Sequence, residues 1–217
     1  PSACYAAQEL LERSDVEVEM FDRLPTPFGL VRAGVAPDHP GTKTVTESFE
    51  RSFRRDAFGL HLDVAIGRDL THAELLDHHH AVIYAVGAST DRRLGIPPGE
   101  DLPGSHAATE FVAWYNGHPP DYADRTFDLS GTTAVIVGNG NVAIDVARIL
   151  TMDVDELART DIADHAWMRC DAAESGRSCC SAVAVLRRPP TATRSSWHSR
   201  TCTASTSSST TPSWNSI

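Results

Sequence analysis

The stretch AVIVGNGNVAIDVARIL at residues 134–150 constrains the fold more than any other part of the sequence. Its first residues, 134–137, form a short β-branched run without charge, which predicts a buried strand of a parallel sheet. The run ends at Gly138, and apolar residues at helical spacing begin at Ala143. The stretch therefore predicts a strand, a tight glycine turn and a helix in succession.

This order of elements is typical of sites that bind the pyrophosphate of a dinucleotide. Gly138 permits the tight turn, Gly140 leaves room for a phosphate beside the backbone, and the small Ala143 lets the helix pack closely on the strand. The helix N-terminus adds free N–H groups and a partial positive charge. We therefore predict a dinucleotide site here, and the alternative is a strand-turn-helix corner that binds nothing.

The overall composition is that of a globular protein, and it excludes some partners. The chain has 217 residues, of which 41% are hydrophobic and 22% are charged. No stretch is long enough for a membrane span and no signal peptide is visible, so we expect a cytoplasmic location. The net charge of −10 argues against nucleic acid as a partner.

The character of the chain changes at residue 167. From there to the end, 19 of 51 residues are Ser or Thr. Six of the 19 basic residues and two of the 29 acidic residues lie in this tail, so its net charge is +4 and that of the preceding 166 residues is −14. Four of the five cysteines also lie there, at spacings that match no zinc or redox motif. We expect residues 167–217 to be a low-complexity, disordered tail outside the fold.

The start of the chain predicts part of a second nucleotide-binding unit. Residues 2–13 have helical spacing, residues 16–21 alternate as in a strand, and Asp22 follows. An acidic residue about 20 positions beyond the start of such a helix bonds a ribose hydroxyl in βαβ nucleotide units. The alternative for Asp22 is a carboxylate that faces solvent. The glycines that belong before Pro1 are missing, so we expect this unit to be incomplete.

The middle of the chain predicts a ligand loop and further elements. Residues 23–43 contain four prolines and three glycines, which predicts an irregular loop that serves a ligand. Residues 45–58 predict a helix, 60–66 a strand, 81–88 a fully buried strand and 109–116 a helix, with a crossover between domains at 95–104.

Two charged groups in this region have ordinary explanations. Arg51, Arg54 and Arg55 lie on the outward face of the predicted helix, and exposed charges are normal on protein surfaces. Three adjacent histidines, 78–80, point in different directions and seldom converge on one ion, so we predict no metal site.

Five segments have a recognisable order along the chain: LPTPFGLVRAGVAPDHP, AVIYAVGASTDRRLGIP, FVAWYNGHP, VIVGNGNVAIDVARIL and LARTDIADHA. With them, the sequence resembles the ferredoxin–NADP+ reductases of the adrenodoxin reductase type, flavoproteins with bacterial members. The resemblance extends from Pro1 to about Ala166, and the combination is far more specific than either nucleotide motif alone.

The resemblance implies an α/β fold of two dinucleotide-binding Rossmann-like (βαβ) domains, both incomplete, followed by the tail. Residues 1–104 would be a partial FAD-binding domain and residues 105–166 a partial NADP-binding domain. In this family, NADPH delivers a hydride to FAD, and the reduced flavin passes single electrons to an iron–sulfur ferredoxin. Such ferredoxins are expected to be acidic, so Arg51, Arg54 and Arg55 become the candidate partner surface.

The resemblance also implies individual site residues. Those for FAD are Ser2 and Ala3 at the end of the pyrophosphate loop, Asp22 in place of the usual glutamate, Leu30 through its backbone, and Ile66 beside the adenine. Those for NADP are Arg92, Asn139, Gly140, Asn141 and Val142, in addition to Gly138 and Ala143 of the motif. His39 matches a histidine near the flavin and is the candidate for proton movement, with an ordinary loop histidine as the alternative.

The sequence departs from the family after residue 166. The adjacent arginines 187 and 188 are not flanked by the family's glycines, so we assign them no role. A change of reading frame near codon 167 would explain the tail, and the genomic sequence across this codon tests that hypothesis. We expect the chain by itself to be weakly active or inactive. Two alternatives stay open, namely a non-catalytic nucleotide-binding remnant and an amidotransferase-linked NADPH reductase subunit.

Overall fold

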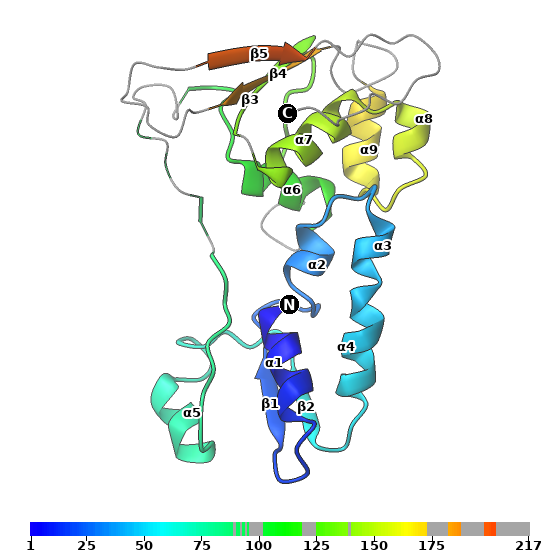
Figure 1. Ribbon diagram of the computed structural model, residues 1–217. Helices are drawn as coiled ribbons and strands as arrows, with labels where there is room; N and C mark the ends of the chain where they lie inside the picture. Colours follow the sequence, from blue (N-terminus) through cyan, green and yellow to red (C-terminus); the bar gives the residue numbers. More distant parts are fainter. Residues whose placement is uncertain are drawn as a thin grey trace. The chain divides into compact units, whose positions relative to one another are not determined.

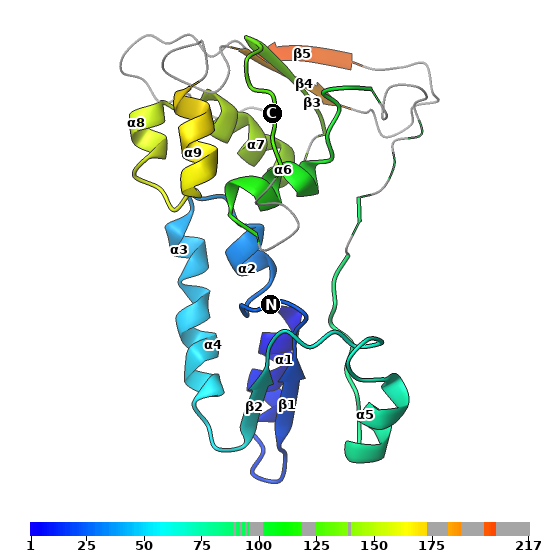
Figure 2. The ribbon, with the colours of Figure 1, turned by 180° about the vertical axis from the view of Figure 1, so that it is seen from behind.

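The computed structural model describes residues 1–88, 90–91, 93, 95, 102–118, 125–138, 140–172, 182–187 and 198–202 (Figures 1 and 2). The chain forms two compact units. The first comprises Pro1–Asp128 and Asp155–Arg169, and the second comprises Leu129–Val154 and Cys170–Ile217. Each unit contains a small sheet with parallel strands.

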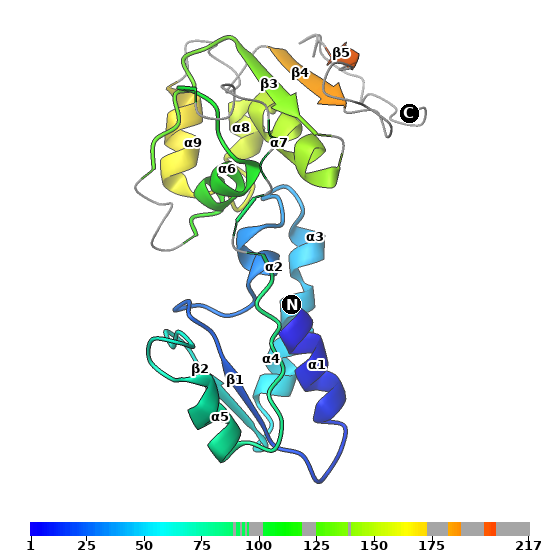
Figure 3. The ribbon, with the colours of Figure 1, turned by 90° about the vertical axis from the view of Figure 1, so that its left-hand side faces the viewer.

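The sheet of the first unit consists of the parallel strands β1 (Val18–Phe21) and β2 (Phe58–His61). Helices α1 (Ser2–Leu10) and α4 (Val45–Phe53) lie to one side of these strands, as Figure 3 shows. Helix α1 contacts β1, α4 contacts β2, and the two helices contact each other. This is the arrangement expected when apolar helix faces cover one face of a parallel sheet.

The core of this half of the first unit is aromatic. Its buried members are Cys4, Phe28, Val31 and Phe49. The Phe53 ring stacks on Phe28 with ring centres 5.7 Å apart. The inward face of α1 is formed by Cys4 and Ala7, and Leu11, which follows the helix, is buried as well.

The prediction that residues 23–43 contain no regular structure is wrong. Two one-turn helices, α2 (Leu30–Ala33) and α3 (Pro40–Lys43), lie within this loop. Proline is compatible with the first turn of a helix because its missing N–H would have no partner there. Gly34 then ends α2, and its N–H donates to the carbonyl of Leu30 at 2.9 Å.

Two elements of the first unit are shorter or earlier than predicted. Helix α4 ends at Phe53 instead of residue 58, and β2 ends at His61, whereas a strand was predicted over 60–66. After β2 the chain turns, because Asp63 has a φ of 57° and the N–H of Val64 donates to the carbonyl of Asp22 at 3.0 Å. The alternating apolar residues therefore continue beyond the strand.

The prediction of a fully buried strand at 81–88 is also wrong. Ile83, Tyr84 and Val86 are 63%, 51% and 80% exposed, and no described strand pairs with this segment. A strand is buried only when neighbours pair with its edges and cover its faces. Within the described residues the sheet of the first unit consists of β1 and β2, and neither strand pairs with this segment.

Four more helices lie wholly or largely in the first unit. Helix α5 (His72–His78) begins with a capping box between Thr71 and Glu74, and the others are α6 (Ala108–Tyr115), α8 (Val154–Leu157) and α9 (Asp164–Asp171).

None of the helices in the described ranges is long and apolar enough to cross a membrane. Within the same ranges, no three His, Cys, Asp or Glu side chains are arranged to hold a metal. The expected crossover at 95–104 falls largely outside the described residues.

The second unit contains the predicted strand-turn-helix. Strand β3 (Thr133–Val137) is followed by α7 (Asn141–Thr151), which begins two residues before Ala143. Strand β3 pairs in parallel with β4 (Ala182–Arg187), and β5 (His198–Cys202) pairs antiparallel to β4. The expectation that β3 is buried is wrong, because Val135 and Val137 are 61% and 41% exposed. Their side of β3 is not covered within the described residues.

The tail differs from its prediction as well. Residues 167–171 belong to α9, and β4 and β5 also lie beyond residue 166, so these parts of the tail have secondary structure. An alternating apolar run, AVAVL, accounts for β4. The predicted domain boundaries at 104 and 166 stay predictions, because the two compact units are defined by packing and not by bound nucleotides.

Candidate functional site

The glycine turn of the second unit has the local geometry that a pyrophosphate needs. A Cβ atom on Gly138 would lie 3.1 Å from the Cβ of Ala143, so each residue must be small for the turn to sit against α7. At Gly140, no heavy atom of the described residues lies within 4 Å of a Cβ position. Gly140 therefore borders open space at the start of the helix.

The first turn of α7 presents free hydrogen-bond donors beside this space. The carbonyl of Gly140 accepts from the N–H groups of Ala143 and Ile144, at 3.1 and 3.3 Å. The N–H groups of Asn141 and Val142 donate no hydrogen bond within the described residues. Free N–H groups at the start of an 11-residue helix favour an anion. Asn139 and Arg92, also predicted to bind NADP, lie outside the described residues.

The first unit has a comparable set of donors at the start of α1. Within the described residues, the N–H groups of Ser2 and Ala3 in the first turn of α1 donate no hydrogen bond, and the N–H of Tyr5 donates to the carbonyl of Pro1 at 3.0 Å. Ser2 is exposed and Ala3 is half-buried. The backbone N–H groups of both predicted residues are therefore unpaired within the described part of the chain.

A second group of donors lies beside this helix start. Phe28 and Gly29 both have positive φ angles, 85° and 50°, just before α2. Within the described residues, the N–H groups of Phe28, Gly29 and Leu30 donate no hydrogen bond. We call these three amides the 28–30 cradle. A Cβ on Gly29 would lie 3.4 Å from Cδ of Pro1, so the cradle and the start of α1 are adjacent.

Asp22 and Ile66 follow the carboxyl ends of β1 and β2, where ligands bind to parallel sheets. One oxygen of Asp22 accepts from the N–H of Leu24 at 3.0 Å. Burial raises the pKa of the Cys4 thiol in α1, the positive charge of the N-terminus lowers it, and the charge of Asp22 raises it. Ile66 is 37% exposed in a turn that bridges to Leu70.

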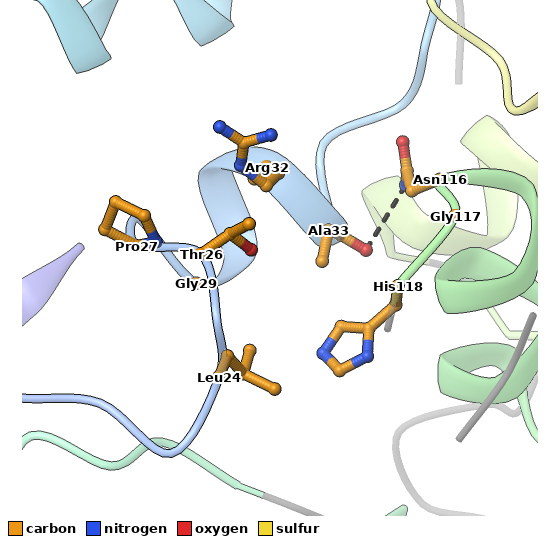
Figure 4. A pocket seen from close by; sticks show the side chains of 9 residues that line it. All are labelled: Leu24, Thr26, Pro27, Gly29, Arg32, Ala33, Asn116, Gly117 and His118. Carbon is orange, nitrogen blue, oxygen red and sulfur yellow. Dashed lines mark hydrogen bonds between the residues drawn. The ribbon is translucent and has the colours of Figure 1, made fainter. Parts of the chain in front are cut away.

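A cavity of about 150 Å3 adjoins the 28–30 cradle within the first unit (Figure 4). Its lining residues are Leu24, Thr26, Pro27, Gly29, Arg32, Ala33, Asn116, Gly117 and His118. The side-chain amide of Asn116 donates to the carbonyl of Ala33 at 3.3 Å, so α2 is tied to the turn after α6. The cavity is bordered by both of these segments.

His39 and the three arginines have distinct surroundings. The imidazole of His39 is 45% exposed, and its Nδ1 lies 3.2 Å from a carboxylate oxygen of Asp38. Arg54 is 80% exposed and Arg51 is exposed. Arg55 instead donates to the carbonyl of Leu11 at 2.5 Å, which anchors the end of α1.

The sequence did not indicate the amides of Phe28 and Gly29 as candidate ligand-binding groups. Gly29 in the Pro-Phe-Gly triplet is a signal that could have been used, because glycine adopts positive φ angles at low cost. No sequence feature indicates a positive φ at Phe28, since such an angle is rare for a bulky residue. Strain of this kind persists where the surrounding structure enforces it.

Comparisons with known proteins identify the relatives of the chain. It is 60% identical over 166 residues to the probable ferredoxin/ferredoxin–NADP reductase of Mycobacterium tuberculosis, which covers 76% of this chain and 28% of that protein. It is 54% identical over 172 residues to the NADPH-ferredoxin reductase FprA of the same species, covering 76% and 37%. The mitochondrial NADPH:adrenodoxin oxidoreductase of Salvelinus fontinalis is 50% identical over 167 residues, covering 76% and 33%.

A solved structure of M. tuberculosis FprA in complex with NADPH matches with a TM-score of 0.74 at 53% identity, covering 77% of this chain and 38% of that one. No protein-family model matches the chain. The chain spans between 28% and 38% of the relatives described here. The likeness to FprA confirms the predicted α/β fold of two partial Rossmann-like units. Over 76% of its length, the chain belongs to the family of the ferredoxin–NADP+ reductases of the adrenodoxin reductase type.

Proposed function

We propose that this chain supplies the FAD and NADPH sites of an oxidoreductase that transfers electrons between NADPH and a ferredoxin. The observation that carries the proposal is that each unit presents unpaired backbone amides at the start of a helix, beside glycines that leave room for a phosphate. Two such sites in one chain suit an enzyme with two dinucleotides. The names of the relatives, a ferredoxin/ferredoxin–NADP reductase and an NADPH-ferredoxin reductase, agree with this assignment.

In the first unit, we assign the FAD pyrophosphate to the 28–30 cradle and the start of α1. Backbone N–H groups from two segments would donate to the phosphate oxygens, and such charge-assisted hydrogen bonds are the strong ones. Asp22 has one carboxylate oxygen on Leu24, and its other oxygen has no hydrogen bond within the described residues. That second oxygen is the one we assign to a ribose hydroxyl. FAD, when bound, converts the two-electron chemistry of NADPH into single-electron transfers.

In the second unit, we assign the NADP pyrophosphate to Gly140 and the N–H groups of Asn141 and Val142. The open space at Gly140 admits a phosphate to the backbone, and Gly138 and Ala143 hold the turn against α7.

His39, in the first unit, is assigned a different role. Its half-exposed imidazole beside Asp38 can exchange a proton with solvent, and we assign it proton movement at the flavin site.

A graft tests the proposed function, because the chain spans only part of its relatives. In this graft, residues 1–166 of the chain replace the matching segment of M. tuberculosis FprA. We expect the purified graft to contain FAD and to reduce cytochrome c with NADPH only when ferredoxin is added. A graft that binds no flavin would favour a remnant that binds one nucleotide. A flavin-containing graft whose NADPH oxidation is indifferent to ferredoxin would favour the amidotransferase-linked alternative.

Ferredoxin recognition can be tested at the exposed arginines of α4. Because Arg55 anchors α1, Arg51 and Arg54 are the pair to change. In the graft, Arg51→Glu with Arg54→Glu should slow ferredoxin reduction most at low ionic strength, since complementary charges mainly raise encounter rates and are screened by salt.

Reduction of an uncharged acceptor by NADPH serves as the control and should hardly change. The matched variant Glu47→Gln with Glu50→Gln removes acidic charge from the same helix and should raise the rate at low salt. If the arginine variant keeps both the rate and the salt dependence of ferredoxin reduction, these arginines are only a solvated surface. The cytoplasmic location stays a prediction.

A further inference from the structure

Lys43, the last residue of α3, makes an ion pair with a residue 118 positions away in the sequence. Its Nζ lies 2.8 and 3.0 Å from the two carboxylate oxygens of Asp161, and 3.3 Å from Oδ1 of Asn116. The Lys43 side chain is only 16% exposed, and all three residues belong to the first unit. By contrast, the pair between Arg13 and Asp15 is 66% and 68% exposed. We call the contacts of Lys43 with Asp161 and Asn116 the Lys43 clamp.

Both partners of Lys43 are themselves fixed to α6. The side-chain amide of Asn116 donates to the carbonyl of Val112 at 3.1 Å. Two residues after Asp161, the N–H of Ala163 donates to the carbonyl of Tyr115 at 2.9 Å. Tyr115 is one of the most deeply buried residues of the chain. The Lys43 clamp therefore joins the short helix α3 to a well-packed helix.

The other end of α3 is His39. This residue is the N-cap of α3, and its carbonyl accepts from the N–H of Thr42 at 3.1 Å. A single helical turn does not hold its shape alone, because helix nucleation is unfavourable. Tertiary contacts at Lys43 must therefore stabilise the turn that carries His39.

We propose that Lys43 is a positioning residue that holds His39 in place through α3, by its ion pair with Asp161 and its hydrogen bond to Asn116. The importance of His39 for proton movement rests on the proposed function. The positioning itself is a property of the chain without any cofactor, so it can be tested separately.

The test uses imidazole NMR spectra and amide hydrogen exchange of the 217-residue chain. The variants are Lys43→Met, Lys43→Arg and Asp161→Asn, and His39→Gln identifies the His39 signal. We expect Lys43→Met and Asp161→Asn to shift or broaden the His39 signal and Lys43→Arg to retain it. The amide N–H of Thr42 in α3 should exchange roughly fivefold faster in the first two variants. The reason is that the charged hydrogen bonds of Lys43 raise the free energy of local opening of α3, and the variants lose them.

Two controls separate positioning from a general loss of structure. The signals of the other nine histidines should stay in place, and Arg13→Met, which breaks the exposed pair with Asp15, should leave His39 unchanged. If Lys43→Met unfolds the chain, Asp161→Asn decides the question, because it keeps the size of the partner side chain. An unmoved His39 signal in folded Asp161→Asn overturns the proposal, and so does an equal displacement of all histidine signals. None of these outcomes depends on NADPH, FAD or ferredoxin.

Discussion

Gly140→Val in the graft should raise the KM for NADPH roughly a hundredfold, equivalent to about 2.7 kcal/mol, and leave the flavin content unchanged. The reason is steric. Gly140 has an extended backbone, with φ −89° and ψ 176°, which any residue adopts, and its Cβ position faces open space in the described residues. A valine should therefore fit the free protein and occupy the place of the pyrophosphate. Steady-state kinetics with varied NADPH measure the effect.

Gly131→Val is the matched control for this substitution. Gly131 precedes β3 in the same unit, and the nearest heavy atom to its Cβ position is a carbonyl oxygen 4.0 Å away. A valine there adds the same bulk away from the first turn of α7, so the KM for NADPH should stay near that of the parent graft. An unchanged KM in Gly140→Val would contradict the assignment of the NADP site.

Leu30→Pro should weaken FAD binding by roughly 10- to 100-fold, because it removes one N–H donor that we assign to a phosphate oxygen. Leu30 is the first residue of α2, a position at which proline is compatible with a helix. The substitution therefore removes the donor and keeps the turn. The ratio of flavin to protein absorbance after purification, followed by titration of the apoprotein with FAD, measures the loss.

Leu30→Ala separates the backbone from the side chain. The Leu30 side chain is 69% exposed, so its removal should change FAD affinity little as long as the N–H is present. Equal affinities in the proline and alanine variants would show that the Leu30 amide does not contact the flavin nucleotide. The Asn116 contact with Ala33 should hold α2 in both variants.

The strand-turn-helix geometry of the candidate site in the second unit could be predicted from the sequence because its determinants are local. Gly138, Gly140 and Ala143 lie within six residues, and each acts on its immediate neighbours. The 28–30 cradle could not be predicted in the same way. It depends on a positive φ at the buried Phe28 and on the closeness of Gly29 to Pro1, which is distant in the sequence.

The wrong predictions of burial have a single physical origin. The apolar runs at 81–88 and in β3 have the composition of buried strands, but burial depends on neighbours that are distant in the sequence. Ile83 and Val86 belong to no strand pair among the described residues, and Val135 is 61% exposed although its strand pairs with β4. Local pattern therefore predicted strand β3 correctly and its environment incorrectly.

Anaerobic mixing of the flavin-loaded graft with NADPH tests the central claim most directly, namely that residues 1–166 contribute both dinucleotide sites of one electron path. We predict that NADPH bleaches the flavin absorbance, that Gly140→Val slows the bleaching at low NADPH concentration, and that added ferredoxin restores the absorbance. A graft whose flavin is bleached by dithionite but not by NADPH at any concentration would contradict the claim.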